Sequence, residues 1–375
     1  MRIGLVLGGG GTVGAAYHAG ALTALEHDLG WDPREAEVVV GTSAGSLVGA
    51  LLRVGIPASD LAAHLVEAYD AASHPMVRGR LVTRPSLPPM DLRAMMLRLP
   101  KLPSTALLGR WLRRPWSVTP VSAVISLMPD GTVPLREELR FFDDAAPGGW
   151  TERPLWVCTT RRSDLRRVVF GRNELITRLG SAVAASCAIP GYLSPVRIGN
   201  RTYVDGGVHS PTNADVLRHE DLDLVIILSP MSAQRVTGWG PEATVRRHAR
   251  RRVEQECRRL RQAGIPTVVL APGPRVLAHT GLDFMSPDRV AKVVGAAFLD
   301  TGRQLATEPV RSALASLRTR RGLPWAEAID AATAEARTAV TLGRGRHRPD
   351  GPSPPPRRAR PEPPRPQMAP RSPRA

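Results

Sequence analysis

Two short apolar runs near the start of the chain are each followed by glycines and then by a helical pattern. The first run, residues 3–7, ends at Gly8, and we expect a helix over residues 14–28. The second run, residues 38–40, ends at Gly41, and we expect a helix to about residue 54. Short uninterrupted apolar runs between helices are typical of buried parallel strands. This order therefore predicts the opening of a parallel α/β sheet.

Further strands and helices are predicted in the second half of the chain. Strands are expected at residues 155–160, 167–170, 196–198, 202–204, 224–228 and 267–270, and Gly199-Asn200 marks a hairpin between the third and fourth. Helices are expected at residues 61–71, 177–186, 242–263, 288–305, 310–317 and 325–339. The expected fold class is α/β.

Residues 76–120 interrupt this pattern, because prolines recur and apolar and basic residues mix there without clear periodicity. Only residues 91–99 and 105–112 look amphipathic. We interpret the segment as an insertion or lid within one domain spanning residues 1–342. Residues 343–375 hold eleven Pro and nine Arg, which predicts a disordered tail.

Composition excludes several classes of protein. The chain has 375 residues, of which 42% are hydrophobic and 23% charged, and this excludes disorder throughout. Aromatic residues make up only 4%, which argues against an antiparallel β-sandwich and against a base-stacking nucleic-acid platform.

The net charge of +17 is concentrated in two segments. Residues 76–116 hold nine basic side chains and one acid, and residues 343–375 hold nine Arg and two acids. Because Met, Leu and Trp accompany the basic residues in the first segment, we predict peripheral contact with an anionic membrane. The alternative is a solvated lid that packs on the core. The tail has the charge to bind nucleic acid or anionic lipid non-specifically, and we predict no specific nucleic-acid partner.

Three cysteines, Cys158, Cys187 and Cys257, are too few and too scattered for a disulfide framework or a zinc site. The N-terminal apolar run is too short for a signal peptide, and the uncharged residues 38–52 fall short of the ~20 residues that a membrane span needs. We expect a cytoplasmic protein whose membrane contact is at the inner surface.

Residues 8–14, Gly-Gly-Gly-Gly-Thr-Val-Gly, match G-x-G-x-x-G directly after a strand. Backbone N–H groups at such a helix start bind negative charge, whether a pyrophosphate or an oxyanion. A dinucleotide site also needs an acid at the end of the second strand, but that strand ends in Gly41-Thr42-Ser43. A dinucleotide-binding enzyme and a purely structural glycine turn are the weaker alternatives.

A second glycine motif, Gly41-Thr42-Ser43-Ala44-Gly45, is a G-x-S-x-G between a strand and a helix. This is the context of a nucleophile elbow, where glycines allow a tight turn that presents the serine at the carboxyl end of the sheet. The helix that follows points its positive dipole end at the hydroxyl. The alternative is that Ser43 only caps the helix.

In a third motif, Tyr203-Val204-Asp205-Gly206-Gly207, a strand runs straight into an acid and two glycines. Alone it favours a turn aspartate. Together, the three motifs place a glycine loop, a serine and a carboxylate at the ends of strands, as a serine hydrolase requires.

The chain resembles the patatin-like phospholipases in these three motifs and in residues 181–191, which look like the helix and turn before the family's Asp strand. The resemblance covers residues 1 to about 228 except 76–150, with the four segments in the family's order. One position departs from the pattern, because Val13 stands where the family usually has Arg or Lys.

The resemblance implies a three-layer α/β/α fold with a mainly parallel central sheet. It also implies a serine acyl hydrolase that cleaves ester bonds of phospholipids, lysophospholipids or related lipids, without a metal or cofactor. Ser43 and Asp205 would form a catalytic dyad. The backbone N–H groups of Gly9, Gly10 and Gly11 would form the oxyanion hole, and Gly14, Gly41, Gly45, Gly206 and Gly207 would support the motifs.

Two alternatives to the dyad enzyme remain at this point. A Ser–His–Asp triad would use His209 or His18, although both fit better as surface or packing residues. A non-catalytic regulatory or interaction protein could retain the fold, and Val13 is the only residue that favours it.

Overall fold

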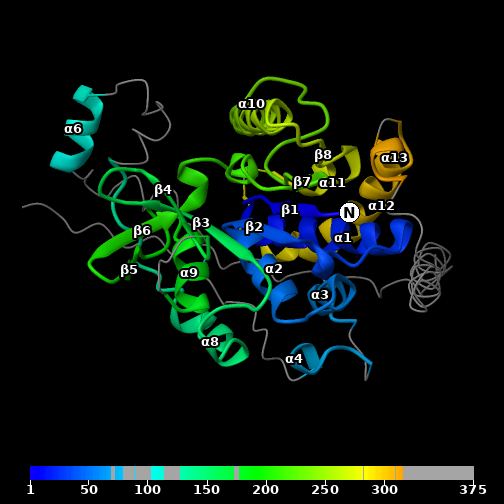
Figure 1. Ribbon diagram of the computed structural model, residues 1–375, viewed down its shortest axis with the longest axis horizontal. Helices are drawn as coiled ribbons and strands as arrows, with labels where there is room; N and C mark the ends of the chain where they lie inside the picture. The colour runs from blue at the N-terminus through cyan, green and yellow to red at the C-terminus, as the bar shows by residue number, and fades with distance from the viewer. Residues whose placement is uncertain are drawn as a thin grey trace, which may run out of the picture. The chain divides into compact units, whose positions relative to one another are not determined.

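A single sheet organises the part of the chain that the computed structural model describes, residues 1–68, 72–78, 88, 103–113, 127–172, 177–281, 283–308 and 310–315. All of these residues belong to one compact unit, Met1–Leu323. Eight strands form the sheet (Figure 1). They are β1 (Ile3–Leu7), β2 (Val38–Thr42), β3 (Leu155–Arg161), β4 (Arg167–Phe170), β5 (Val196–Ile198), β6 (Arg201–Asp205), β7 (Leu224–Leu228) and β8 (Thr267–Leu270).

Five of these strands, in the order β3-β2-β1-β7-β8, are parallel. Every residue of β1, β2 and β7 is buried. Unbroken Val, Ile and Leu runs suit these positions because helices cover both faces of a parallel sheet. All five strands point their carboxyl ends to the same edge of the sheet, where the glycine loop follows β1 and the serine motif follows β2.

The three remaining strands are antiparallel to their neighbours. Along β3, β2 pairs with residues 155–158, β6 with residues 159–161, and β4 with residues 157–160. Because β4 overlaps both pairings, it occupies one edge of β3, and β2 and β6 share the other. They run toward each other along that edge, so that Thr42 and Asp205 lie opposite consecutive residues of β3.

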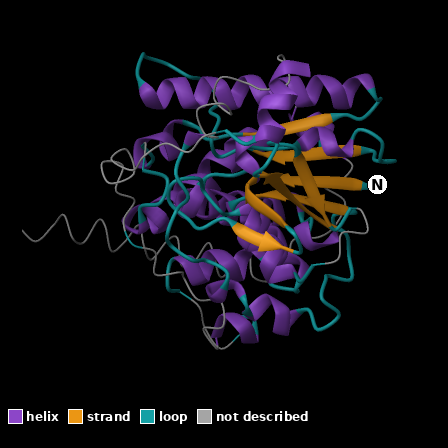
Figure 2. Cartoon of the chain, turned by 90° about the vertical axis from the view of Figure 1, so that its left-hand side faces the viewer, coloured by secondary structure: helices purple, strands orange, loops and turns teal. Residues whose placement is uncertain are grey.

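Helices cover both faces of the sheet. Alternate residues of β1 show the two layers, since Leu5 and Leu7 belong to one core cluster and Val6 to another. In Figure 1, α10 lies above the strands and α2, α3 and α9 lie below, and Figure 2 shows α10 lengthwise along its layer. The first layer contains α1 (Gly11–Leu29), α2 (Ala44–Arg53), α3 (Ala58–Leu65), α9 (Leu179–Ser186) and α12 (Val290–Leu305), and the second α10 (Pro241–Gln262) with the 3₁₀ helix η5 (Ala214–Leu217).

Shorter helices complete the described residues. They are α4 (Pro75–Arg78), α6 (Thr105–Arg113), α8 (Phe141–Ala145), α11 (Pro274–His279), α13 (Val310–Ala313) and the 3₁₀ helices η1 (Pro33–Glu35), η3 (Glu137–Leu139), η4 (Gly206–Val208) and η6 (Pro287–Arg289). The expected three-layer α/β/α fold with a mainly parallel sheet is confirmed.

Two helices, α1 and α3, begin three residues before the predicted position. α1 begins at Gly11 rather than residue 14, because Gly11 adopts φ 62° and turns the loop straight into the helix. α3 spans Ala58–Leu65 rather than residues 61–71. Its start is set by the buried Glu26 carboxylate of α1, which accepts hydrogen bonds from the N–H groups of Ala58 and Ser59.

Most of the predicted insertion at residues 76–120, the helix predicted at 325–339 and the tail at 343–375 lie outside the described residues. Within the insertion, α6 matches the amphipathic piece predicted at residues 105–112. Its Leu107 is buried in a small cluster with Leu165, Val204 and Val208. This helix therefore packs beside β6, the strand that ends at Asp205.

Candidate active site

Ser43 occupies a strained turn between β2 and α2. Its backbone has φ 53° and ψ −125°, a region that residues with a side chain rarely adopt. A Cβ on Gly41 would collide with Ser46, and one on Gly45 would collide with the carbonyl of Leu7. The glycines of the motif are therefore required for the turn, which is the geometry of a nucleophile elbow.

The Ser43 hydroxyl does not cap the helix that it precedes. It donates a hydrogen bond to Asp205 Oδ2 at 2.6 Å, and both residues are 6% exposed. The other carboxylate oxygen, Oδ1, accepts the N–H of Gly207 at 2.6 Å. Asp205 is therefore both the turn aspartate and the direct partner of the serine, and no histidine lies between them.

Burial sets the protonation behaviour of this carboxylate. Desolvation raises the pKa of Asp205 to about 6, while its hydrogen bonds from Ser43 and Gly207 oppose the rise. The carboxylate is consequently a stronger base than an ordinary aspartate and is still mostly ionised at neutral pH.

The glycine loop lies against the serine, with the position of a Gly9 Cβ only 3.3 Å from Ser43 Cβ. Within the described part of the chain, the N–H groups of Gly10 and Gly11 have no acceptor. They stand at the N-terminus of α1, where the helix dipole also favours negative charge. An oxyanion bound to Ser43 can therefore accept hydrogen bonds from both.

One expected oxyanion donor is already engaged. The Gly9 N–H donates to the carbonyl of Pro211 at 2.8 Å, as the Gly8 N–H does to Leu228 at 2.9 Å. The Gly9 N–H therefore holds the loop against the segment around Pro211 and is not available to an oxyanion. Of the three oxyanion donors expected from the sequence, Gly10 and Gly11 remain available.

The loop is held in place without a basic residue at position 13. Val13 is 2% exposed, and its N–H donates to the carbonyl of Phe284 at 3.1 Å. His18, buried on α1, donates from Nε2 to the carbonyl of Gly8 at 2.6 Å. Burial lowers the pKa of His18 to about 4, so this histidine is neutral and braces the loop.

Ser186, the last residue of α9, is a part of the site that the sequence did not single out. Its hydroxyl accepts the N–H of Ser43 at 2.9 Å and donates to the carbonyl of Cys158 in β3 at 2.7 Å. It therefore links the strained elbow to β3, the strand that pairs with both β2 and β6. The signal was its position in the 181–191 segment, four residues before Pro190.

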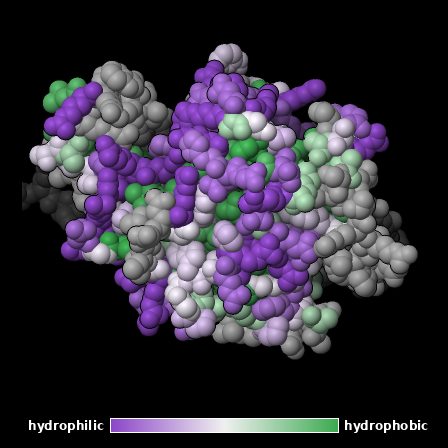
Figure 3. Space-filling view, in the orientation of Figure 1, coloured by the Kyte–Doolittle hydropathy of each residue, from purple (hydrophilic) through white to green (hydrophobic). Residues whose placement is uncertain are grey.

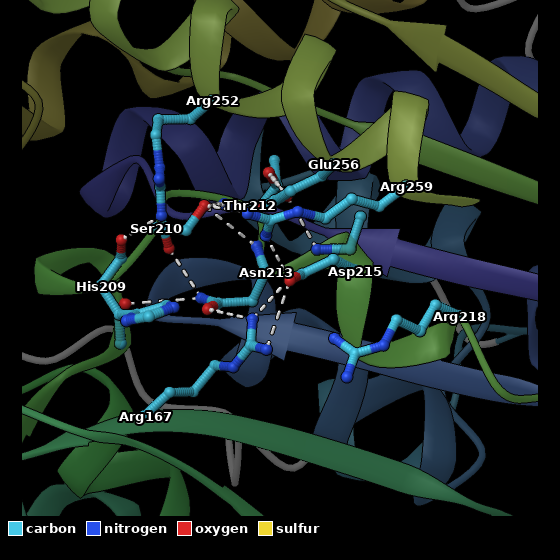
Figure 4. Close-up of polar contacts among 12 residues, drawn as sticks. Arg167, His209, Ser210, Thr212, Asn213, Asp215, Arg218, Arg252, Glu256 and Arg259 are labelled. Atoms are coloured by element: carbon cyan, nitrogen blue, oxygen red, sulfur yellow. Dashed lines mark hydrogen bonds and ion pairs between the residues drawn. The ribbon is translucent and has the colours of Figure 1, made fainter. Parts of the chain in front are cut away.

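The segment after Asp205, residues 206–214, joins the parts of the site (Figure 4). Asn213 donates from Nδ2 to Thr42 Oγ1, to the carbonyl of Ser210 and to that of Gly206. Together with the Gly9 contact to Pro211, these bonds connect the segment to the elbow, the glycine loop and the aspartate turn. We call residues 206–214 the junction segment.

A buried carboxylate on α10 anchors the junction segment. Glu256 accepts hydrogen bonds from Ser210 Oγ at 2.6 Å, Thr212 Oγ1 at 2.5 Å and the Ala214 N–H at 2.9 Å. One turn away, Arg252 donates to the carbonyl of His209 at 2.9 Å. Helix α10 thus holds the junction segment in place from the second layer of the fold.

Neither a cysteine nucleophile nor a metal site is supported by the described residues near Ser43. Cys187 lies beside Ser46 at 3.9 Å, but burial raises its pKa to about 12, so the thiol is not a ready nucleophile. Among the described residues, no group of His, Cys, Asp and Glu is arranged to hold a metal ion.

Two pockets adjoin Ser43 and have Gly11, Ser43, Ile189 and Met285 in common in their linings; we call them the two branches of the site. The larger branch, about 410 Å³, is also lined by Asp205, His209, Met231, Val245, His248 and Arg252. The smaller branch, about 160 Å³, is also lined by Leu47, Leu51, Leu61, Leu135, Leu139 and Val290. In Figure 3 hydrophobic residues surface below α10 among hydrophilic ones.

A strained serine at a strand–helix elbow is typical of serine hydrolases on α/β folds. The family model described as patatin-like phospholipase matches residues 5–218, more than half of the chain. The protein belongs to the patatin-like phospholipase family, whose members are lipid acyl hydrolases.

Similar solved structures are distant. VipD from Legionella pneumophila has 15% identity and a TM-score of 0.38, and the match covers 84% of this chain and 67% of VipD. The type III effector protein ExoU has 17% identity and a TM-score of 0.32, and the match covers 92% of this chain and 63% of ExoU. The chain thus spans about two thirds of the length of each. No curated protein sequence matches the chain.

Proposed function

We propose that this protein is a serine acyl hydrolase that cleaves ester bonds of phospholipids, lysophospholipids or related lipids, with Ser43 as nucleophile and Asp205 as base. The observation that carries the proposal is the 2.6 Å hydrogen bond from the strained Ser43 hydroxyl to the buried Asp205 carboxylate. No cofactor takes part in the steps that these residues perform.

In the first half-reaction Ser43 Oγ attacks the ester carbonyl carbon while its proton passes to Asp205 Oδ2. The N–H groups of Gly10 and Gly11 stabilise the oxyanion; loss of one such donor typically costs about 10²–10³ in rate. The bond to the leaving oxygen then breaks, and Asp205 returns the proton to that oxygen. Water repeats the sequence on the acyl-enzyme and releases the carboxylic acid.

An active-site-directed fluorophosphonate tests the proposal directly. The wild-type protein should become labelled at Ser43 and should release fatty acid from phospholipid vesicles, and Ser43→Ala should do neither. A folded wild-type protein that is neither labelled nor active would instead favour the interaction protein. The sequence favours that alternative only through Val13, and the loop around Val13 is held by other contacts.

The proposed lipid substrate implies contact with a membrane surface, and α6 supports a location for it. Leu112 is 87% exposed and Leu108 41% exposed on this helix, while its Leu107 is buried. Exposed leucines next to Arg113 match an interfacial helix that inserts apolar side chains below anionic headgroups. We place the proposed peripheral contact on this helix, on a protein that works in the cytoplasm at the inner membrane surface. Within the described residues, no helix has the length and apolar character of a membrane span.

A further inference from the structure

The two branches of the site diverge from the atom at which the reaction would occur. Ser43 lines both, and so does Gly11, which offers an oxyanion donor. The acyl chain and the leaving group depart from the ester carbonyl in different directions, so each needs a separate space. We propose that the acyl chain occupies the smaller branch and the leaving group the larger one. This inference rests on the function proposed above.

The position of Asp205 decides between the two orientations. Asp205 lines the larger branch and is absent from the lining of the smaller one. The same carboxyl group that receives the serine proton must deliver it to the leaving oxygen, so that oxygen must face Asp205. The leaving group therefore enters the larger branch, and the acyl chain is directed away from the aspartate.

The lining of the smaller branch fits an alkyl chain. Leu47 and Leu51 are four residues apart and lie on one face of α2, the helix that begins directly after Ser43. At ~1.5 Å per residue, Leu51 lies about 12 Å from Ser43 along the helix axis. Leu61 and Leu139 close the same space, and Lys, Arg, Asp and Glu are absent from its described lining. The branch is thus a channel for a long unbranched chain, and Leu51 limits its length.

Both branches are lined mainly by apolar side chains, and the larger one differs from the smaller one in containing a basic side chain. Arg252 and Thr244 line it, and the hydrogen bond from Arg252 to the His209 carbonyl fixes the guanidinium in the wall. Apart from Asp205, Arg252 is the charged residue in the described lining. A cation at this place favours a leaving group that carries negative charge over one that is neutral.

Chain-length profiles test the orientation. Rates would be measured on p-nitrophenyl esters from butyrate to palmitate for wild type and for Leu51→Phe, which fills the end of the smaller branch. Leu51→Phe should lower kcat/KM about tenfold or more, relative to butyrate, for the longest chain that the wild type accepts, because a larger side chain overfills the space. Leu47→Phe is the second variant; its site is only partly buried, so its folding is less at risk. It should shorten the accepted chain further.

Val245→Phe provides the opposite test, because Val245 lines the larger branch. It should keep the chain-length profile of the wild type and instead lower kcat/KM for methylumbelliferyl butyrate relative to the less bulky p-nitrophenyl butyrate. Leu299→Phe, a matched change at an exposed site on α12, should leave both profiles unchanged.

The outcomes separate this inference from the proposed function. If Val245→Phe shortened the accepted chain and the Leu47 and Leu51 variants did not, the orientation would be reversed and the inference wrong. Unchanged profiles in folded, active variants would also overturn it while leaving the hydrolase intact. A wild type that hydrolyses no ester of the series would overturn the proposed function and this inference together.

Discussion

At the scale of single residues, the Asp205 carboxylate has an unusual pKa because the fold buries it. Only the ionised form accepts the Ser43 proton, so activity should rise with pH through the pKa of about 6 and then level off. The measurement is kcat/KM for a short soluble ester between pH 4 and 8, since lipid packing does not complicate that substrate. If kcat/KM instead rose with pH near pH 4, the Asp205 carboxylate would be well hydrated in the active protein.

Removing the Asp205 charge should separate activity from stability. Asp205→Asn should lower kcat/KM by about 10³-fold or more, because the base is lost. The folded state raises the pKa of Asp205, so the cost of burying the ionised form is absent below pH ~4, grows up to about pH 6 and is complete above it. The thermal midpoint of the variant at pH 7 should therefore equal or exceed that of the wild type.

Two further variants check the same pair. The double variant of Ser43→Ala with Asp205→Asn should be little worse than either single change, since the two side chains act as one unit. His209→Ala should lose far less activity than Asp205→Asn, because Ser43 bonds the aspartate directly. If His209→Ala were as damaging, a triad would replace the dyad.

The sequence predicts the pairing of Ser43 with Asp205 better than it predicts the residues that support this pair. Ser43 and Asp205 stand in motifs whose glycines have a visible steric purpose, which the structure bears out at Gly41 and Gly45. By contrast, the engagement of the Gly9 N–H by Pro211 is a contact across about 200 residues of chain. Ser186 likewise acts on Ser43 from a distant helix. Such contacts between distant segments cannot be predicted from the local sequence pattern.

At the scale of elements, α10 should control the site through the junction segment. Glu256→Gln replaces an acceptor oxygen with a donor, so one of three hydrogen bonds to the segment must rearrange. We expect kcat on a soluble ester to fall about tenfold with KM nearly unchanged, because the substrate does not contact Glu256. Hydration of a loosened Asp205 should also shift the acid limb of the pH profile below 6.

The shift in the pH profile distinguishes a positioning role from a loss of stability, which would lower the amount of active enzyme without moving the limb. Glu256→Ala should be more damaging than Glu256→Gln, which can still accept two of the bonds. The matched control is Glu254→Gln on the exposed face of α10, which breaks only the ion pair with Arg250. A Glu256→Gln profile identical to that of the control would remove the positioning role.

The hydrophobic pattern predicts which elements exist but not how they meet. Strands as short as residues 38–40 could be read from uninterrupted apolar runs, whereas the capping of α3 by Glu26 could not, because the two are brought together only by packing. The meeting of β2 and β6 along one edge of β3 was also beyond prediction, since strand pairing between distant segments leaves little trace in either one.

At the scale of the whole molecule, the positive charge should direct the protein to anionic membranes. Neutralising Arg110, Arg113 and Arg114 should weaken binding to vesicles that contain phosphatidylglycerol and lower activity on packed lipid. Hydrolysis of a soluble ester should stay nearly unchanged, because the substitutions leave Ser43 and Asp205 in place. Each basic residue near such a surface contributes about 1 kcal/mol, and salt weakens the attraction.

The control for that prediction neutralises three arginines on another helix, α10. Arg251, Arg258 and Arg261 are exposed on α10. If neutralising these three weakened vesicle binding as much as the first set, total charge rather than the α6 region would govern the attraction. Vesicle sedimentation at low and physiological salt would measure both.

Because β2 and β6 meet end to end along β3, we expect the Ser43–Asp205 site to form late in folding. Ser43 and Asp205 are separated by 162 residues, and the pairing of β3 with both β2 and β6 brings them together. Contacts between distant segments form slowly, because a long loop must close first. If the proposed dyad is correct, Ser43 leaves the ribosome well before Asp205 has been added to the chain, and the nascent chain should therefore be inactive. Recovery of activity on refolding should likewise lag behind recovery of helical signal, which makes esterase activity a reporter of the last step of sheet assembly.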